Sequence, residues 1–224
     1  MNRYEMKEGI IMENAIIIDH VSKTFKGKTI VSDTCISLER GSIHGLVGRN
    51  GSGKTVLMKM VCGFLKSDTG SIIVNDSVVG KDHDFATNTG VIIETPAFIS
   101  YESGFRNLKN LAMIKRKIGD REIRDCMKQV GLDPDDKKRV GKYSLGMRQR
   151  LAIAQAIMEK PSVLILDEPM NGLDKHGVEE IRELLLELKK GGTTILLSSH
   201  YAEDIEALCD CVYEIDEGIV SKMT

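Results

Sequence analysis

Eight consecutive residues have the composition of a loop that binds phosphate. They read Gly-Arg-Asn-Gly-Ser-Gly-Lys-Thr and match the pattern G-x-x-x-x-G-K-[ST] at every fixed position. Glycines let the backbone wrap closely around an anion, so that successive N–H groups point inward. A lysine ammonium can bridge the β- and γ-phosphates, and a threonine hydroxyl can hold Mg²⁺. We therefore predict that a nucleotide binds at Gly48, Arg49, Asn50, Gly51, Ser52, Gly53, Lys54 and Thr55.

Two adjacent carboxylates follow a short apolar segment, Val163–Leu166. Phosphoryl transfer needs one carboxylate near the metal ion and one near the attacking water. We assign Asp167 to the Mg²⁺ ion, together with Thr55, and Glu168 to the water as general base. Acids are also common at solvated strand ends, but the phosphate loop favours the catalytic interpretation.

Strand and helix patterns place both features at the edge of a sheet. Ile43–Val47 is a short apolar strand that runs into the loop, and Val56–Leu65 has apolar residues at helical spacing. Further along, strand-like and helical segments alternate, which indicates a parallel sheet covered on both faces. Ligands of such folds bind beyond the carboxyl ends of the strands. Between about residues 96 and 150 the pattern is helical and highly charged, which predicts an inserted helical subdomain.

Composition limits the classes of function. The chain has 224 residues and a formal net charge of −2, so no overall basic field favours a nucleic-acid partner. Its five cysteines are odd in number and scattered, which indicates reduced thiols in a cytoplasmic protein. If both lay on a strand, Cys209 and Cys211 would share one face; they are interpreted as apolar packing residues. No apolar run approaches the roughly 18 residues that span a bilayer.

A third motif lies between the loop and the carboxylates. Tyr143–Arg150 reads Tyr-Ser-Leu-Gly-Met-Arg-Gln-Arg and resembles the L-S-G-G-Q-x-Q-R motif of ABC ATPases. The resemblance extends from about Ala15 to the end of the chain. It implies one ABC ATPase domain over residues 15–224, preceded by an extension over residues 1–14. The implied fold is α/β, a P-loop NTPase parallel-sheet core with an N-terminal antiparallel β portion and an inserted α-helical subdomain.

Other positions match the family's functional residues. Phe25 falls where the family has an aromatic residue that stacks on adenine. Glu94 falls in the Q-loop, where it would contact Mg²⁺ or the attacking water. Asp174 belongs to a segment that resembles the D-loop, and His200 resembles the switch histidine that contacts the γ-phosphate. The resemblance thus implies ATP as ligand, Mg²⁺ as cofactor and ATP hydrolysis as activity.

The third motif has the chemistry of a second anion site. Ser144 is a good N-cap for a helix that starts there, and a serine hydroxyl, the Gly146 backbone N–H and a helix dipole can bind an anion together. The phosphate loop already holds the nucleotide of its own chain. In the family this site closes over the γ-phosphate bound to the opposite subunit, which implies a head-to-tail homodimer, or a dimer with a paralogous ATPase.

Three positions depart from the commonest family pattern. Leu145 and Met147 replace a glycine and the glutamine of the third motif, and Glu94 replaces a glutamine. The segment from Gly90 to Phe98, Gly-Val-Ile-Ile-Glu-Thr-Pro-Ala-Phe, resembles ABC ATPases that export, or confer resistance to, antimicrobial peptides such as bacitracin and lantibiotics. In that subgroup glutamate is usual at this position. The resemblance implies an exporter with separate ATPase and permease chains.

Aromatic residues after Glu94 suggest where the permease binds. Phe98, Tyr101 and Phe105 lie close together in a chain with only 4% aromatic residues. The segment 94–108 could form a groove for a permease helix, or these side chains could pack the helical subdomain. The first alternative places the protein in the cytoplasm, held on the inner face of the membrane by the permease. A soluble ABC ATPase acting on ribosomes or DNA, and a small-metabolite kinase, are the competing functions.

Overall fold

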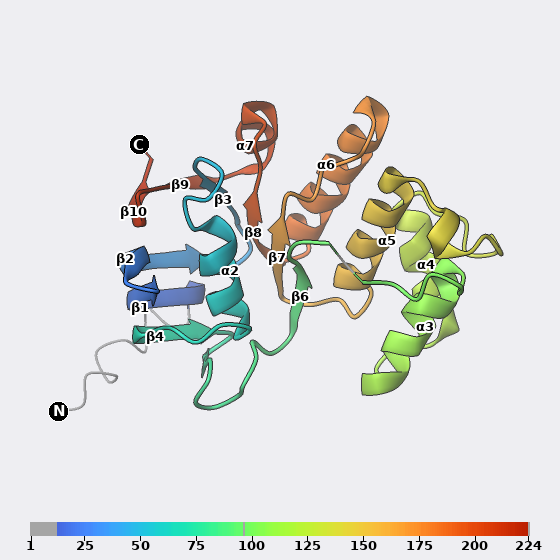
Figure 1. Cartoon of the computed structure of the whole chain (residues 1–224). Helices are drawn as coiled ribbons and strands as arrows, with labels where there is room; N and C mark the ends of the chain where they lie inside the picture. The colour runs from blue at the N-terminus through green and yellow to red at the C-terminus, as the bar shows by residue number, and fades with distance from the viewer. Residues whose placement is uncertain (1–12, 96, 224) are drawn as a thin grey trace.

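The N-terminal third of the chain forms an antiparallel sheet. The computed structural model describes residues 13–95 and 97–223 (Figure 1). The sheet has the strand order β2-β1-β4-β5. Its strands span β1 (Asn14–Phe25), β2 (Lys28–Glu39), β4 (Thr69–Val74) and β5 (Ser77–Val78). The first residue of β1, Asn14, pairs with Glu39, so the sheet includes the last residue of the predicted 1–14 extension; the rest of that extension up to residue 12 lies outside the described residues.

The predicted catalytic residues lie at the ends of strands in a second sheet. Its order is β10-β9-β3-β8-β7-β6, with neighbours parallel from β9 to β6. The last strand, β10, pairs antiparallel with β9 and forms a C-terminal hairpin with it. The strands span β3 (Ile43–Val47), β6 (Thr89–Ile92), β7 (Val163–Asp167), β8 (Thr194–Ser198), β9 (Cys211–Asp216) and β10 (Ile219–Lys222).

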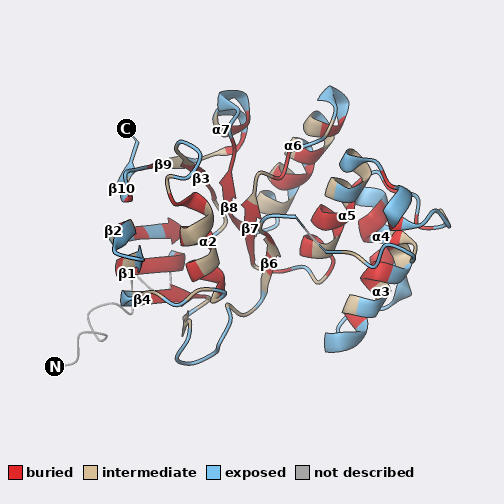
Figure 2. Cartoon of the chain, in the orientation of Figure 1, coloured by how far each residue is buried: buried red, intermediate tan, exposed pale blue. Residues whose placement is uncertain are grey.

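Helix α2 (Lys54–Cys62) lies between the two sheets (Figure 1). Its buried residues, Leu57, Met58 and Val61 among them, pack in one apolar cluster with residues of both sheets. Figure 2 shows this helix and the strands around it largely buried. Because α2 follows the phosphate loop directly, this packing fixes the position of the loop. On the other face of the second sheet lies α6 (Lys175–Lys190), followed by α7 (Ala202–Leu208) near the C-terminal strands.

The remaining helices gather at one end of the molecule. They are α3 (Gly104–Lys115), α4 (Asp120–Gln129), the 3-10 turn η2 (Val140–Lys142) and α5 (Leu145–Ile157). Leu108, Ile123, Met127 and Leu151 form their common core, which continues to the strands β6 and β7. The arrangement agrees with the predicted α/β fold class.

Cys209 and Cys211 pack against the two apolar clusters, as predicted, but from different elements. Cys209 follows Leu208, the last residue of α7, and Cys211 begins β9, so the two thiols do not share a face of one strand. Cys35 is exposed. All five cysteines are free thiols. Among the described residues, no helix has both the length and the apolar character needed to cross a membrane.

Candidate functional site

The phosphate loop joins β3 to α2, and two of its glycines lie in close contact with neighbouring backbone. Gly48, Gly51 and Gly53 all have positive φ angles, which side-chain-bearing residues rarely adopt. A Cβ on Gly48 would lie 2.3 Å from the carbonyl oxygen of Ile215, and one on Gly53 would lie 2.8 Å from that of Ile30. The loop is therefore held tightly against neighbouring backbone.

Lys54 is a buried cation inside this loop. Its side chain donates hydrogen bonds to the carbonyl oxygens of Gly48 and Arg49, at 2.6 and 3.1 Å. The residue is only 7% exposed, and none of the ion pairs among the described residues includes it. A buried charge held by neutral groups alone is costly, so the loop suits an anionic ligand. The hydroxyl of Ser52 is buried there without a hydrogen-bond partner among the described residues.

The end of β7 lies beside the start of α2. Thr55 donates its hydroxyl hydrogen bond to Asp167, with the oxygens 2.7 Å apart. The other carboxylate oxygen of Asp167 accepts a hydrogen bond from Ser198, also at 2.7 Å. A threonine hydroxyl and a carboxylate are both hard oxygen ligands, which suit Mg²⁺. These two residues therefore fit the predicted metal site, where the ion would neutralise phosphate charge.

Glu168 and His200 face each other across adjacent strand ends. The imidazole Nε2 lies 3.0 Å from a carboxylate oxygen of Glu168, and the backbone N–H of His200 donates to the other oxygen at 3.3 Å. Burial raises the pKa of Glu168 above its ordinary value, while the neighbouring His200 acts in the opposite direction. A carboxylate with a raised pKa is the better proton acceptor. Glu168 also adopts a positive φ of 53°.

A network that sequence reasoning missed positions these two residues. Ser198, at the end of β8, is fully buried and its hydroxyl accepts a hydrogen bond from the Glu168 N–H at 3.0 Å. The next residue, Ser199, donates to Asp204 at 2.7 Å and accepts from the N–H of Tyr201 at 3.1 Å. These bonds hold the turn that carries His200. The signal available in the sequence was that Ser198 and Ser199 lie at the end of a strand parallel to the one that bears Asp167.

Behind this turn lies a buried ion pair. Asp204 is 1% exposed and accepts hydrogen bonds from Nε and Nη2 of Arg182, on α6. Asp204 thus receives hydrogen bonds from both Arg182 and Ser199. The pair ties α6 and α7 to the turn that carries His200, although neither charged residue touches the candidate pocket.

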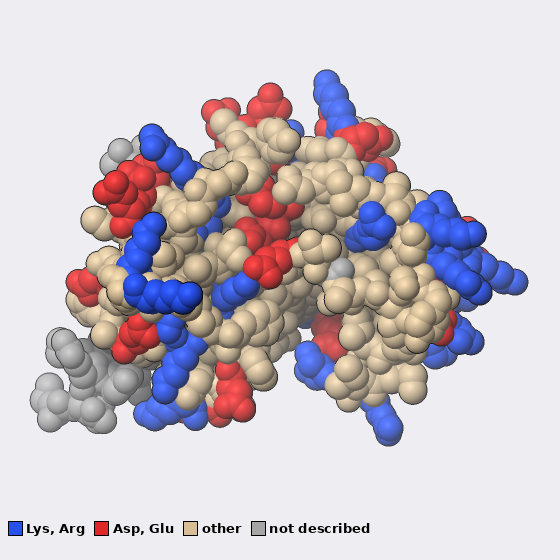
Figure 3. Space-filling view, in the orientation of Figure 1, with Lys and Arg blue, Asp and Glu red and all other residues tan. Residues whose placement is uncertain are grey.

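An open cavity of about 410 Å³ brings many of the predicted residues together. Phe25 stands at its edge with 43% of its surface exposed, as a side chain available for stacking would be. Figure 3 shows acidic side chains gathered in the middle of this face, over β7 and β8, with Lys and Arg nearby. The predicted residues that line the cavity are Phe25, Asn50, Gly51, Gly53, Lys54, Thr55, Asp167, Glu168 and His200.

Glu94 lies beside this cavity and forms an ion pair with a residue that does not line it. It lines a neighbouring hollow of about 290 Å³, which shares Asp167 and Glu168 with the first. Its carboxylate pairs with Lys59 of α2, with Nζ and the oxygen 2.6 Å apart. The Glu94 side chain is 65% exposed, so the pair is a surface contact. Sequence reasoning did not single out Lys59, because the pair depends on how α2 meets the end of β6.

The third motif lies apart from the cavity. Ser144 caps α5 and accepts a hydrogen bond from the Met147 N–H at 3.2 Å, as its N-cap prediction requires. Ser144 is exposed and Gly146 half-buried, and neither lines the cavity around Lys54. Asp174 caps α6 and accepts from the Gly177 N–H at 2.9 Å. Asp174 also lies outside both hollows.

The aromatic segment divides between core and surface. Phe98 and Phe105 are half-buried and pack against the core of the helical end. Phe105 also carries the Arg124 guanidinium over its ring, 4.9 Å from the centroid. Tyr101, by contrast, is 69% exposed. The core-packing alternative therefore holds for Phe98 and Phe105, while the side chain of Tyr101 lies at the surface.

The fold and the site define the class of the P-loop nucleoside triphosphatases: a phosphate loop between strand and helix, beside an acidic strand end. Residues 31–171 match the family described as ABC transporter, and the chain belongs to this family. It is an ABC ATPase, which binds and hydrolyses ATP. It is 42% identical to an uncharacterized ABC transporter ATP-binding protein, YybJ, of Bacillus subtilis, over 89% of this chain and 91% of that one.

Two further relatives support the same assignment. The bacitracin transport ATP-binding protein BcrA of Enterococcus faecalis is 39% identical over 93% of this chain and 68% of its own length. A solved structure, described as the ATP-binding subunit of an ABC transporter, superposes with a TM-score of 0.85 at 25% identity, over 94% of this chain and 90% of that one. The resemblance to ABC ATPases, and to those that handle antimicrobial peptides, is confirmed.

Proposed function

We propose that the chain powers a separate membrane permease that exports antimicrobial peptides or drugs. The observation that carries the proposal is the cavity in which Lys54, Asp167, Glu168 and His200 converge, in a chain of this family. The bacitracin transport relative supports peptide-like substrates. The export machinery then consists of an ATPase without substrate contacts and a permease that selects the substrate.

Each residue of the site has a role in this proposal. Phe25 stacks on adenine, and the loop from Gly48 to Thr55 binds the phosphates. Thr55 and Asp167 hold Mg²⁺, which supplies charge neutralisation. Glu168 accepts the proton of the attacking water, and burial favours that role because it raises the pKa of the Glu168 carboxyl.

Contacts with the γ-phosphate and the water complete the site. His200 contacts the γ-phosphate from the turn held by Ser199. Glu94 approaches the metal and the water after leaving Lys59. The Glu94 pair is exposed, so its loss costs little, on the order of 0–1 kcal/mol.

ATP joins two copies of the chain head-to-tail in this proposal. Ser144 and Gly146 of one copy, with Asp174 nearby, contact the γ-phosphate bound to the other copy. Support comes from the exposed position of Ser144 at the start of a helix of 13 residues, away from the cavity of its own chain. Hydrolysis removes the shared phosphate contact and releases the dimer.

The permease contacts the segment 94–108, of which residue 96 lies outside the described part. Tyr101 and Ile99 are exposed there and offer apolar surface to a helix. The segment begins at Glu94, beside the catalytic carboxylates, so a shift of the permease reaches the nucleotide directly. The protein works in the cytoplasm, on the inner face of the membrane.

The dimer is tested with Glu168→Gln. This variant should bind Mg-ATP, lose most turnover and accumulate as a dimer, measured by light scattering at saturating Mg-ATP. Lys54→Ala is the matched control, because it weakens nucleotide binding and should stay monomeric. A Glu168→Gln protein that binds ATP but remains a monomer would contradict the head-to-tail mechanism.

The transport role is tested by purification of the tagged chain from detergent-solubilised cells of its host. A polytopic membrane protein in stoichiometric amount, identified by mass spectrometry and reduced by Tyr101→Asp, supports the proposal. Ribosomal or DNA-associated partners without a membrane protein would favour the soluble ABC ATPase instead.

A further inference from the structure

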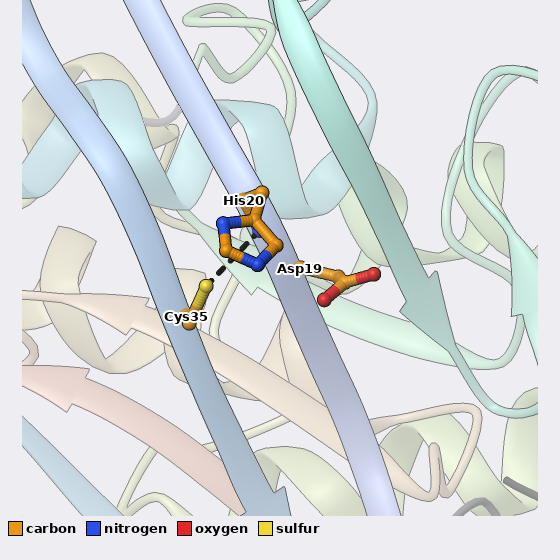
Figure 4. Close-up of side chains that lie close together, drawn as sticks. All are labelled: Asp19, His20 and Cys35. Atoms are coloured by element: carbon orange, nitrogen blue, oxygen red, sulfur yellow. Dashed lines mark hydrogen bonds between the residues drawn. The ribbon is translucent and has the colours of Figure 1, made fainter.

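Three side chains with metal-binding atoms meet on the N-terminal sheet, away from the nucleotide site. The carboxylate of Asp19, the imidazole of His20 and the thiol of Cys35 each offer one atom, and these atoms all lie within 4.8 Å of one another. Figure 4 shows His20 drawn between the other two side chains, with Cys35 on the neighbouring strand. Among residues 13–95 and 97–223, no second group meets the same criterion.

A bulge in β1 creates this arrangement. Side chains of consecutive strand residues normally point to opposite faces of a sheet. Here the register between β1 and β2 shifts, so that Asp19 and His20 together oppose Cys35 alone. His20 has a φ of 52°, a conformation that histidine adopts more readily than most residues. Bulges of this kind re-aim side chains.

Neighbouring residues hold the bulge in place. The N–H of His20 donates to Cys35 Sγ at 3.3 Å, and Thr69 donates its hydroxyl hydrogen bond to the His20 carbonyl at 3.2 Å. Gly70, on β4, lies against the bulge: a Cβ there would come within 2.3 Å of the carbonyl oxygens of both Asp19 and His20. Contacts with β2 and β4 therefore fix the backbone that carries the Asp19 and His20 side chains.

A second carboxylate orients the imidazole. Asp33 Oδ1 lies 2.7 Å from His20 Nδ1, and its own N–H donates to Ser22 Oγ at 2.9 Å. Histidines that bind metals usually donate their other ring N–H to a carboxylate, which fixes the tautomer. With Nδ1 engaged in this way, Nε2 is the nitrogen available for a metal ion. This contact independently points to a ligand site.

We propose that Asp19, His20 and Cys35 bind a divalent transition metal ion of the zinc type. One thiolate, one imidazole and one carboxylate are the donors that Zn²⁺ takes in proteins, and water would complete four ligands. On binding, the Cys35 thiol releases its proton to solvent and its sulfur bonds to the metal. The ion joins β1, the strand that ends at Phe25, to β2.

The experiment uses untagged, metal-free full-length protein without nucleotide. Titration with Co²⁺ should produce a thiolate-to-Co²⁺ charge-transfer absorption band at one ion per chain, and Zn²⁺ should displace it. The melting temperature should rise by about 5–10 °C when free Zn²⁺ is a hundredfold above its dissociation constant. Neither readout depends on ATPase activity.

Matched variants separate this site from other thiols and imidazoles. Cys35→Ser should abolish the band, and His20→Asn should do so while tolerating the positive φ. Asp33→Asn should weaken Co²⁺ binding about 10- to 100-fold. Cys211→Ser and His83→Asn are the controls and should bind as the parent does. Because Cys35 and His20 are exposed, their variants should keep the circular dichroism spectrum of the parent.

Two results would overturn the proposal. One is the absence of any thiolate-to-Co²⁺ band in the parent protein. The other is a band that survives Cys35→Ser or disappears in Cys211→Ser, since either would place the metal elsewhere.

Discussion

Replacement of Ser198 by alanine should damage both stability and catalysis, although Ser198 does not line the nucleotide cavity. Its hydroxyl donates to Asp167 and accepts from the N–H of Glu168, at 2.7 and 3.0 Å. A hydrogen bond to a charged group contributes about 1.5–3 kcal/mol, and an unpaired N–H adds to the loss. We expect Ser198→Ala to lower the free energy of unfolding by about 2–4 kcal/mol.

Unfolding by urea and by heat measures the loss of stability, and ATPase kinetics measures the loss of catalysis. The melting temperature should fall by about 5–15 °C, from 2–4 °C for each kcal/mol in a chain of this size. A shift of about 1 Å in the catalytic groups costs on the order of 100-fold in rate, so kcat should fall by about that factor. Ser198→Cys, which keeps a weak S–H donor, should lie between the parent and Ser198→Ala.

The reasoning would be refuted by a variant with unchanged stability and unchanged kcat. Loss of stability with normal kcat would also count against it, because it would mean that Asp167 and Glu168 keep their positions without this hydroxyl. A Ser162→Ala variant is a useful comparison. Ser162 also bonds to several polar groups, but it does so far from the nucleotide cavity.

Three other substitutions test separate parts of the structure. Gly48→Ala should abolish binding of a fluorescent ATP analogue, because its Cβ would lie 2.3 Å from the Ile215 carbonyl oxygen; near-normal affinity would contradict this. Arg182→Ala leaves Asp204 buried without its cation and should cost about 3–5 kcal/mol in urea unfolding; a loss below about 1 kcal/mol would contradict it. Glu168→Gln should raise the melting temperature at neutral pH. Burial raises the pKa of Glu168 in the folded state, so protonation stabilises the fold below the unfolded pKa, and this contribution disappears as pH rises through the folded pKa. The gain from glutamine should therefore vanish on acidification, and a gain independent of pH would argue against this cause.

Local signals predicted several of the elements well. The strand Ile43–Val47 has the predicted bounds, because apolar periodicity and glycine positions are properties of short segments. The N-cap of α5 at Ser144 was likewise predictable from one residue and its context. Where a feature is encoded within a few neighbouring residues, the sequence was sufficient.

Features that depend on long-range packing were missed. The bond between Ser198 and Asp167 requires the two to be partners in the register of β7 and β8, although they are 31 positions apart. The Glu94–Lys59 pair requires α2 to reach the end of β6. Cys209 and Cys211 belong to different elements because α7 extends to Leu208, which leaves Cys209 outside β9. No local pattern encodes these juxtapositions.

Leu145 stands where the third motif of the family has a glycine, and its side chain packs against a glycine elsewhere in the structure. The Leu145 side chain covers Gly172, where a Cβ would lie 2.4 Å from Leu145 Cγ, and Gly172 has a φ of 78°. The bulk of the leucine is therefore accommodated by a second glycine in the loop before α6. That contact joins the start of α5 to the segment that ends in Asp174.

The same helix also contacts the beginning of that loop. Gln149 donates to the carbonyl oxygen of Pro169 at 2.8 Å, one residue after Glu168. Helix α5 thus contacts the loop near both of its ends, at Pro169 and at Gly172. A displacement of α5 by a ligand at Ser144 would be transmitted through these contacts to Glu168. Physical contact of this kind, rather than proximity in sequence, is what can couple a second anion site to the catalytic carboxylate.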